Sequence, residues 1–120
     1  MAVMSVPATV LLVEDNAVIA MNTEILLLDL GVQKVETAAS VAGAMALIDA
    51  ERFDLALLDL RLKEDEDSLP IAQRLRAEGV PFVFATGANE DLTLPEDLQG
   101  APMLKKPYGF DDLAQIVRGD

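Results

Sequence analysis

The segment Leu55–Leu60, near the middle of this 120-residue chain, is the feature that most constrains its fold. It is a continuous apolar run interrupted by one carboxylate, that of Asp59. Such a run indicates a strand buried on both faces, which is typical of the centre of a parallel sheet. A charge at the end of a buried strand is costly unless it lies at the rim of the sheet beside a partner. We therefore expect Asp59 to lie at the carboxyl edge of a parallel sheet, where open α/β proteins bind their ligands.

Strand and helix patterns alternate along the whole chain. The expected strands are Thr9–Val13, Gln33–Thr37, Asp54–Leu58, Val80–Ala85 and Ala101–Leu104, of which the second is polar enough to lie near an edge. Helices are expected after the caps Asn16, Ser40 and Ser68 and over Gly109–Val117, with Gly31 and Gly79 ending the first and the third. The segment Ala88–Gly100 contains Thr93 and Pro95, so any helix there is expected to be short or frayed. Five strands that alternate with helices predict a parallel sheet with helices on both faces, in a single domain over residues 1–120.

Apolar residues recur at helical spacing in the expected helices, which predicts the side that each helix buries. These residues are Val18, Met21, Ile25 and Leu28 in the first helix, Val41, Ala44, Met45 and Ile48 in the second, Ile71, Ala72 and Leu75 in the third, and Phe110, Leu113, Ile116 and Val117 in the last. Met103 is also expected to be a core residue. The acidic run Glu64–Asp67 is expected to be a solvated loop.

The charge and the composition argue against several functions. The formal net charge is -12 at pH 7, so the chain repels nucleic acid and anionic membranes. The absence of cysteine and histidine excludes disulfides, thiolate chemistry and a phosphohistidine on this chain. No apolar run approaches the roughly 18 residues that span a bilayer, and residues 1–7 lack the basic start of a signal peptide. We expect a cytoplasmic protein that binds neither nucleic acid nor membrane.

Polar residues follow four of the five expected strands. Glu14 and Asp15 follow the first strand, Asp59 the third, Thr86 the fourth and Lys106 the fifth. The carboxyl ends of parallel strands share one edge, so these side chains can converge. Three carboxylates in one pocket repel one another and require a cation, and oxygen ligands without His or Cys favour Mg²⁺. A carboxylate nucleophile beside a hard metal ion, a lysine and a hydroxyl is suited to phosphoryl transfer.

These motifs resemble those of the response-regulator receiver domains of two-component signalling, along essentially the whole chain. Val13–Asn16 resembles the acidic pair after the first strand, Leu58-Asp59 the phospho-accepting aspartate, Thr86 the switch hydroxyl and Lys106-Pro107 the lysine–proline signature. The resemblance implies a flavodoxin-like, doubly wound sheet with five parallel strands in the order 2-1-3-4-5 and five helices. It also implies a phosphoprotein that acts in a phosphorelay, and that is not an enzyme beyond accepting a phosphoryl group and slowly losing it.

The resemblance assigns a role to each carboxylate. Asp59 accepts a phosphoryl group from the phosphohistidine of a sensor histidine kinase or of a histidine phosphotransfer protein. Asp15 and Asp59 ligate Mg²⁺ directly, together with the backbone carbonyl of Arg61. Glu14 acts mainly through metal-bound water.

The resemblance also assigns the hydroxyl and the lysine. Lys106 pairs with the phosphoryl oxygens, and Thr86 moves to hydrogen-bond one of them. Most receivers carry Tyr or Phe three residues before this lysine, coupled to the hydroxyl, but this chain has Met103 there. Tyr108, after the proline, occupies an ordinary position for an aromatic residue in the family. The output of the switch is therefore expected in the ordering of Ala88–Gly100.

A finer resemblance is to a subgroup of single-domain receivers marked by a Phe-Ala-Thr-Gly motif after the fourth strand, the FAT GUY subgroup. Phe84–Gly87 matches this motif, whereas Ala88 replaces the aromatic residue that usually follows the glycine. The subgroup occurs in alphaproteobacteria, often in the general stress response, and pairs with histidine kinases of the HWE/HisKA2 type. It implies a receiver without an output domain that binds a partner or relays or drains phosphoryl groups, and we expect a monomer or weak dimer.

The sequence leaves other functions open. A receiver-like interaction module that binds partners without phosphorylation fits the same fold. A phosphatase of the haloacid-dehalogenase kind would have Asp-x-Asp after the first strand, where this chain has Glu14-Asp15-Asn16. A flavodoxin-like FMN carrier needs a phosphate-binding loop at that place, and the acidic pair would repel the phosphate. Taken singly, Asp59 fits a loop cap, the acidic pair a charge at a helix start, and Thr86 a turn residue.

Overall fold

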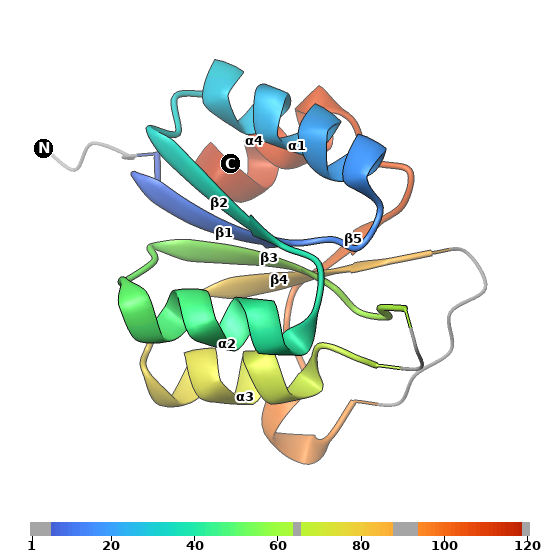
Figure 1. Cartoon of the computed structure of the whole chain (residues 1–120). Coiled ribbons are helices and arrows are strands. Elements are labelled where there is room, and N and C mark those ends of the chain that lie inside the picture. The colour runs from blue at the N-terminus through green and yellow to red at the C-terminus, as the bar shows by residue number, and fades with distance from the viewer. Residues whose placement is uncertain (1–5, 64–65, 88–93, 119–120) are drawn as a thin grey trace, which may run out of the picture.

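The strand β3 (Leu55–Asp59) lies at the centre of a five-stranded parallel sheet in the computed structural model of the chain (Figure 1). The structure describes residues 6–63, 66–87 and 94–118. The strand order is β2-β1-β3-β4-β5, where the other strands are β1 (Thr9–Val13), β2 (Lys34–Ala38), β4 (Phe82–Thr86) and β5 (Met103–Lys105). This is the flavodoxin-like order that the family resemblance implied. β2 lies at one edge, as its polar sequence indicated.

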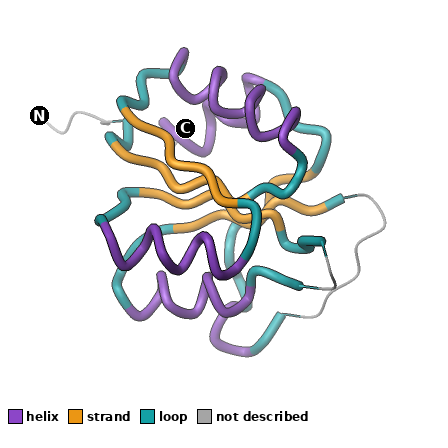
Figure 2. The backbone as a smooth tube through the Cα atoms, in the orientation of Figure 1, coloured by secondary structure: helices purple, strands orange, loops and turns teal. Residues whose placement is uncertain are grey.

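Helices cover both faces of the sheet (Figures 1 and 2). α1 (Ala17–Asp29) and α4 (Phe110–Arg118) lie on one face, and α2 (Val41–Ala50) and α3 (Leu69–Ala77) lie on the other. The described residues therefore contain four α-helices, whereas five were expected. In the segment Ala88–Gly100, residues 88–93 lie outside the described ranges, and the rest forms one short 3-10 turn, η1 (Glu96–Leu98). This agrees with the expectation that the fourth helix is short or frayed.

The two faces of β3 belong to two separate hydrophobic cores. Leu55 and Leu57 pack with the residues of α1 and α4, whereas Ala56 and Leu58 pack with those of α2 and α3. Successive side chains of a strand point to opposite faces, so a strand between two helical layers must be apolar at every position. Burial of one leucine side chain contributes roughly 1.5–3 kcal/mol, so this strand holds both layers to the sheet. Asp59 is the buried exception at its carboxyl end.

The strand boundaries differ slightly from the expected ones. β2 and β3 begin and end one residue later than expected, and β4 and β5 begin two residues later and end one later. Pro81 and Pro102 directly precede β4 and β5. Proline has no N–H to donate to a ladder, which accounts for both late starts. Their carbonyls still accept hydrogen bonds from Ala56 N and Phe84 N, so the sheet continues past them.

The apolar stripe expected to be the buried side of α1 instead faces solvent. Val18, Met21, Ile25 and Leu28 are 62%, 58%, 51% and 43% exposed. The buried residues of α1 are Ala20, Thr23 and Leu27. Both sets have helical spacing, because this helix is apolar over most of its circumference, and spacing alone does not distinguish them.

Two other residues expected in the core lie at the surface. Met103 is 47% exposed, because β5 is a short edge strand that buries only its central residue, Leu104. Phe110 is 41% exposed, because it begins α4, whose buried side is formed by Leu113 and Val117. The remaining expected core residues of α2, α3 and α4 are buried or packed against a core, as predicted.

The loop after β3 is tied to two helices, although a solvated loop was expected there. Residues 64 and 65 lie outside the described ranges. Glu66 Oε1 accepts a hydrogen bond of 3.3 Å from Val41 N at the start of α2. Asp67 Oδ1 accepts one of 3.0 Å from Leu69 N and so caps α3, whereas Ser68, the expected cap, makes no side-chain capping bond. The chain directly after Asp59 is therefore held in place from both sides.

Candidate functional site

The polar residues predicted to converge lie at one edge of the sheet, where the strands end. Glu14 and Asp15 follow β1, Asp59 ends β3, Thr86 ends β4 and Lys106 follows β5. One carboxylate oxygen from each of the three acidic residues lies within 4.8 Å of the other two. Glu14 and Asp59 are only 4% and 5% exposed, and Asp15 is half-buried. The pairing of β1 with β3 brings the acidic ends of these two strands together.

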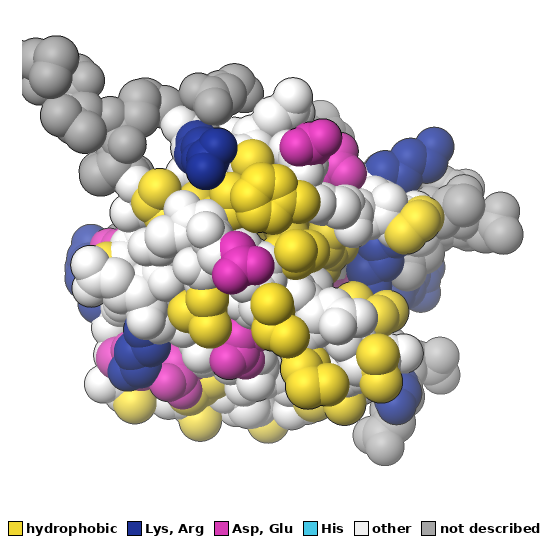
Figure 3. Space-filling view, turned by 90° about the horizontal axis from the view of Figure 1, so that it is seen from above, with side chains coloured by type: hydrophobic (Ala, Val, Ile, Leu, Met, Phe, Trp, Pro, Cys, Tyr) yellow, Lys and Arg dark blue, Asp and Glu magenta, His cyan; other side chains and the backbone are white. Residues whose placement is uncertain are grey.

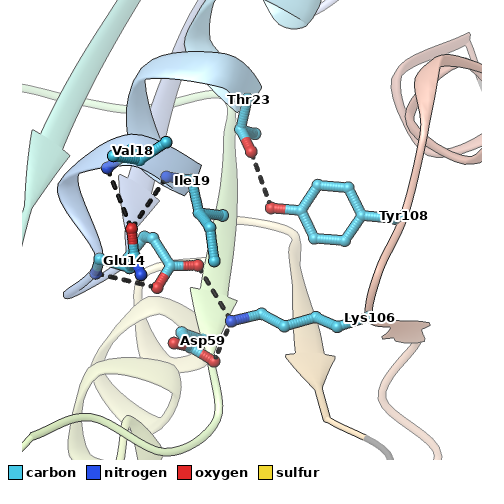
Figure 4. Close-up of polar contacts among 8 residues, drawn as sticks. Glu14, Val18, Ile19, Thr23, Asp59, Lys106 and Tyr108 are labelled. Carbon is cyan, nitrogen blue, oxygen red and sulfur yellow. Dashed lines mark hydrogen bonds and ion pairs between the residues drawn. The ribbon is translucent and has the colours of Figure 1, made fainter.

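The ammonium group of Lys106 lies between the two buried carboxylates (Figure 4). Lys106 Nζ donates a hydrogen bond of 3.0 Å to Glu14 Oε1, and it lies 3.0 Å from Asp59 Oδ1. The second oxygen of Glu14 accepts a hydrogen bond of 3.2 Å from Asn16 N. Asn16 in turn caps α1, as expected, because its Oδ1 accepts from the backbone N–H groups of Val18 and Ile19. Glu14 therefore connects Lys106 to the start of α1.

Burial and charge shift the protonation of both Asp59 and Lys106. Burial raises the pKa of Asp59 to about 7, and the neighbouring Glu14 carboxylate adds to the increase, while the ammonium of Lys106 opposes it. Burial alone lowers the pKa of Lys106, but its close contacts with the carboxylates of Glu14 and Asp59 outweigh that effect and the pKa is raised. A lysine that stays charged and a carboxylate that ionises near neutral pH suit a site that receives an anion.

The three carboxylates fit a small, hard cation. The cluster contains three carboxylates, and the one ammonium group paired with it contacts two of them, so an excess of negative charge remains. Asp59 Oδ1 is buried, and although it is at ion-pair distance from Lys106, no donor among the described residues is aligned for a hydrogen bond to it. Oxygen-only ligands and excess negative charge favour Mg²⁺ over transition metals. The donor set therefore matches the cation that the sequence predicted.

Thr86 and Arg61 lie at the same edge of the sheet. Asp59 pairs with Ala85 in the register of β3 and β4, so Thr86 is one residue further along the neighbouring strand. The carbonyl of Thr86 accepts a hydrogen bond of 2.8 Å from Lys106 N, which fixes the start of the lysine segment. Arg61 follows Asp59 by two residues and forms a bridge with Asp67 across the loop. Their backbone positions are compatible with the roles expected for them.

The sequence reasoning missed a contact beside this site. Thr23 of α1 is 2% exposed, and its Oγ1 lies 2.9 Å from the hydroxyl oxygen of Tyr108, at hydrogen-bond distance (Figure 4). A groove of about 520 Å³ lies next to the pair, lined by Ile19, Leu26 and other residues of α1 and by the segment from Lys106 to Tyr108. A threonine in the apolar sequence of α1 was the available signal, because a buried hydroxyl requires a hydrogen-bond partner.

The fold and the site together define an α/β protein with a pocket of three carboxylates at the carboxyl edge of its sheet. Residues 10–118 match the family model of the response regulator receiver domain, and the chain belongs to this family. Domains of this family are the receiver modules of two-component response regulators. No helix in the described ranges is long and apolar enough to cross a membrane.

Several known proteins are similar to the chain. The alginate biosynthesis transcriptional regulatory proteins AlgB of Pseudomonas putida and Pseudomonas aeruginosa are 36% identical over 107 residues, which is 87% of this chain and 24% of theirs. The chain thus spans about a quarter of the length of these relatives. The solution structure of SdrG from Sphingomonas melonis Fr1 is 39% identical, with a TM-score of 0.80 over 93% of this chain and 94% of that one. A CheY-like receiver domain from Methylobacillus flagellatus is 25% identical, with a TM-score of 0.80 over 92% and 96%.

Proposed function

We propose that Asp59 receives a phosphoryl group from the phosphohistidine of a histidine kinase or a histidine phosphotransfer protein, in a reaction that requires Mg²⁺. The observation that carries the proposal is the buried Asp59 carboxylate, held 3.0 Å from the Lys106 ammonium beside two further carboxylates. A carboxylate is rarely buried in such company unless its ionisation serves the function of the protein.

The residues of the site fit the steps of this transfer. An oxygen of the ionised Asp59 attacks phosphorus as the phosphorus–nitrogen bond breaks, and the bonding electron pair stays on the imidazole of the donor. The Lys106 ammonium already lies at the attacking carboxylate, so it can offset the charge of the incoming phosphoryl oxygens without a large rearrangement. Mg²⁺, when bound, supplies further charge compensation for the same oxygens.

The hydrogen bonds of the site support different roles for the three carboxylates in binding Mg²⁺. Both oxygens of Glu14 already accept hydrogen bonds, one from Lys106 and one from Asn16, which supports a role for Glu14 through metal-bound water. Asp15 and Asp59 are the carboxylates left for direct ligation, with the backbone carbonyl of Arg61 as the third protein ligand. Thr86, at the end of β4, is the hydroxyl that we assign to a phosphoryl oxygen.

We base the finer family position on the residues at the end of β4 and directly after it. Phe84–Gly87 carry the Phe-Ala-Thr-Gly motif, so we place the chain in the FAT GUY subgroup and expect a kinase of the HWE/HisKA2 type as its donor. Docking of a protein donor is supported by the exposed apolar stripe of α1, Val18, Met21, Ile25 and Leu28. Hydrophobic side chains are spread over the α1 side of the molecule in Figure 3. Exposed apolar side chains that share one face of a helix are a common feature of protein-binding surfaces.

Intact mass measurement after incubation with acetyl phosphate tests the proposal. We expect one phosphoryl adduct on the wild type with Mg²⁺, and none on Asp59→Asn or in the presence of a chelator. Acetyl phosphate replaces the kinase, so the test does not depend on the identity of the partner. A folded wild type without an adduct, and without a stable beryllofluoride complex, would contradict the proposal and favour a module that binds partners without phosphorylation.

A further inference from the structure

The short linker between β5 and α4 carries both Lys106 and Tyr108. It is anchored at its start, where Lys106 N donates to the carbonyl of Thr86 at 2.8 Å, and at its end, where Gly109 N donates to Asp112 Oδ2 at 2.9 Å. Between these anchors, the two long side chains reach different partners (Figure 4). Lys106 reaches the buried carboxylates, and Tyr108 reaches Thr23 of α1. The two side chains therefore share one short backbone segment that is fixed at both ends.

The contact between Tyr108 and Thr23 is well fixed. Thr23 is 2% exposed and lies on the side of α1 that packs on the sheet. The ring of Tyr108 is half-buried and packs against the core that includes Leu27 and Leu113. Burial raises the pKa of the Tyr108 hydroxyl, which therefore stays protonated at neutral pH and can donate to or accept from Thr23. A hydrogen bond that is partly shielded from solvent in this way is costly to break without a replacement.

The same residues form a closed ring of contacts around the site. Lys106 binds Glu14, and Glu14 accepts from the backbone of Asn16, which caps α1. α1 carries Thr23, and Thr23 binds Tyr108, which lies two residues after Lys106. The ring thus joins the ammonium group that faces Asp59 to α1 by two routes, one at the start of the helix and one in its middle.

We propose that Tyr108 is a positioning residue for Lys106, and that its hydrogen bond with Thr23 couples the state of the Asp59 site to α1. The inference rests on the function proposed above and concerns the regulation of that same site. A phosphoryl group brings roughly one and a half to two negative charges to Asp59 and attracts the Lys106 ammonium away from Glu14. Because the linker is short, this shift moves Tyr108 relative to Thr23.

The movement of Tyr108 changes the groove beside α1. It is lined by Ile19 and Leu26 of α1 together with Lys106, Pro107 and Tyr108, and it holds about 520 Å³. A change in the Tyr108 contact therefore changes the shape of a surface next to the exposed stripe of α1. Coupling of this kind is reciprocal: because the phosphoryl group disturbs a contact that is formed without it, loss of the contact must strengthen binding of a phosphoryl group or its mimic at Asp59.

The composition of the chain allows the surroundings of Tyr108 to be followed directly by optical spectroscopy. Tyr108 is the single tyrosine and there is no tryptophan, so tyrosine near-UV circular dichroism and fluorescence report on this residue alone. The experiment loads the wild type with Mg²⁺ and beryllofluoride, a phosphoryl mimic, and follows bound beryllofluoride by ¹⁹F NMR and Tyr108 by its optical signals. We expect both signals to change together in one titration.

Variants of the pair test the reciprocal effect. Tyr108→Phe and Thr23→Val are expected to tighten beryllofluoride binding by about fivefold or more, and the double variant no further than either single one. Thr23→Ser keeps the hydroxyl and is expected to bind like the wild type. Thr37→Val, at an exposed threonine of β2, is the matched control. Thermal unfolding of each variant confirms that it is folded before its affinity is compared.

The outcomes separate the two proposals. Bound beryllofluoride with an unchanged Tyr108 signal, and with Tyr108→Phe binding as tightly as the wild type, would overturn the coupling while leaving Asp59 as the phosphoryl acceptor. Absence of any bound beryllofluoride in the folded wild type would overturn the proposed function and the coupling with it. A gain of affinity in Thr23→Val that is absent in Thr23→Ser supports the coupling, because a purely apolar packing role would not depend on the hydroxyl.

Discussion

Lys106 Nζ donates a 3.0 Å hydrogen bond to Oε1 of Glu14, a residue 92 positions earlier in the chain. The contact joins the end of the first strand to the end of the last, across the edge where Asp59 is buried. The Glu14 side chain is 3% exposed and that of Lys106 is 21% exposed, so the pair is shielded from solvent. Ion pairs in such surroundings are strongly disrupted by removal of one partner, because the other charge stays buried.

Replacement of Lys106 by alanine is therefore expected to destabilise the metal-free protein at pH 8 by roughly 2–4 kcal/mol. Added Mg²⁺ is expected to recover more stability in Lys106→Ala than in the wild type, because the lysine competes with a cation for the same carboxylates. Urea unfolding with and without Mg²⁺ measures both effects. Lys105→Ala, at the exposed neighbouring lysine, is the matched control and should change the free energy of unfolding by less than about 0.5 kcal/mol. Equal losses in the two variants would contradict the buried pairing.

The raised pKa of Asp59 predicts a specific pH dependence of stability in the presence of a chelator. Burial raises the pKa of this carboxyl from 3.8 to about 7, so the folded state holds the proton more tightly than the unfolded state. The contribution to stability is fully present below pH 3.8 and is lost as the pH rises through 7. Asp59→Asn removes this loss and should be more stable than the wild type at pH 8 by on the order of 2–4 kcal/mol.

Urea unfolding of the chelated protein at several values between pH 4 and 8 checks this prediction. The wild type should lose stability across that interval more steeply than Asp59→Asn. Asp97→Asn, which removes an exposed carboxylate from η1, should follow the wild type. Parallel profiles for wild type and Asp59→Asn would show that Asp59 ionises in the folded chain as easily as it does in solvent.

The single tyrosine gives a second prediction about protonation. Burial raises the pKa of Tyr108 above 10, while its contact with Thr23 opposes the increase. Absorbance of the phenolate should therefore develop above pH 10 in the folded protein and at a still higher pH in Thr23→Val, which lacks the hydroxyl. Because the folded state holds this proton more tightly, its contribution to stability is lost as the pH rises beyond 10. If Tyr108 in the folded protein titrates at the ordinary pKa of a tyrosine, its ring is exposed to solvent and the prediction is wrong.

The strand ends were predictable because buried parallel strands and the polar residues after them have strong, local sequence patterns. Glu14, Asp15, Asp59, Thr86 and Lys106 all lie at the sheet edge where the sequence placed them. Long-range side-chain contacts were not predictable in the same way, since the pairing of Tyr108 with Thr23 depends on how α1 is rotated against the sheet. The local sequence of α1 is compatible with two orientations, and only packing against β1, β2 and α4 selects one.

The chosen orientation of α1 leads to a prediction about its two faces. Ile25 is 51% exposed, whereas Leu27 is fully buried. Ile25→Ser should change the free energy of unfolding by less than about 0.5 kcal/mol, because isoleucine and serine differ little in helix propensity and no core contact is lost. Leu27→Ala should cost about 2–5 kcal/mol through loss of buried contacts and the cavity left behind. Urea unfolding compares the two, and similar losses would show that α1 is rotated so that Ile25 also packs on the sheet.

Phosphoryl uptake by Ile25→Ser from acetyl phosphate should equal that of the wild type, because this small donor need not contact the exposed face of the helix. A selective defect of the same variant with a protein donor would then identify that face as the docking surface.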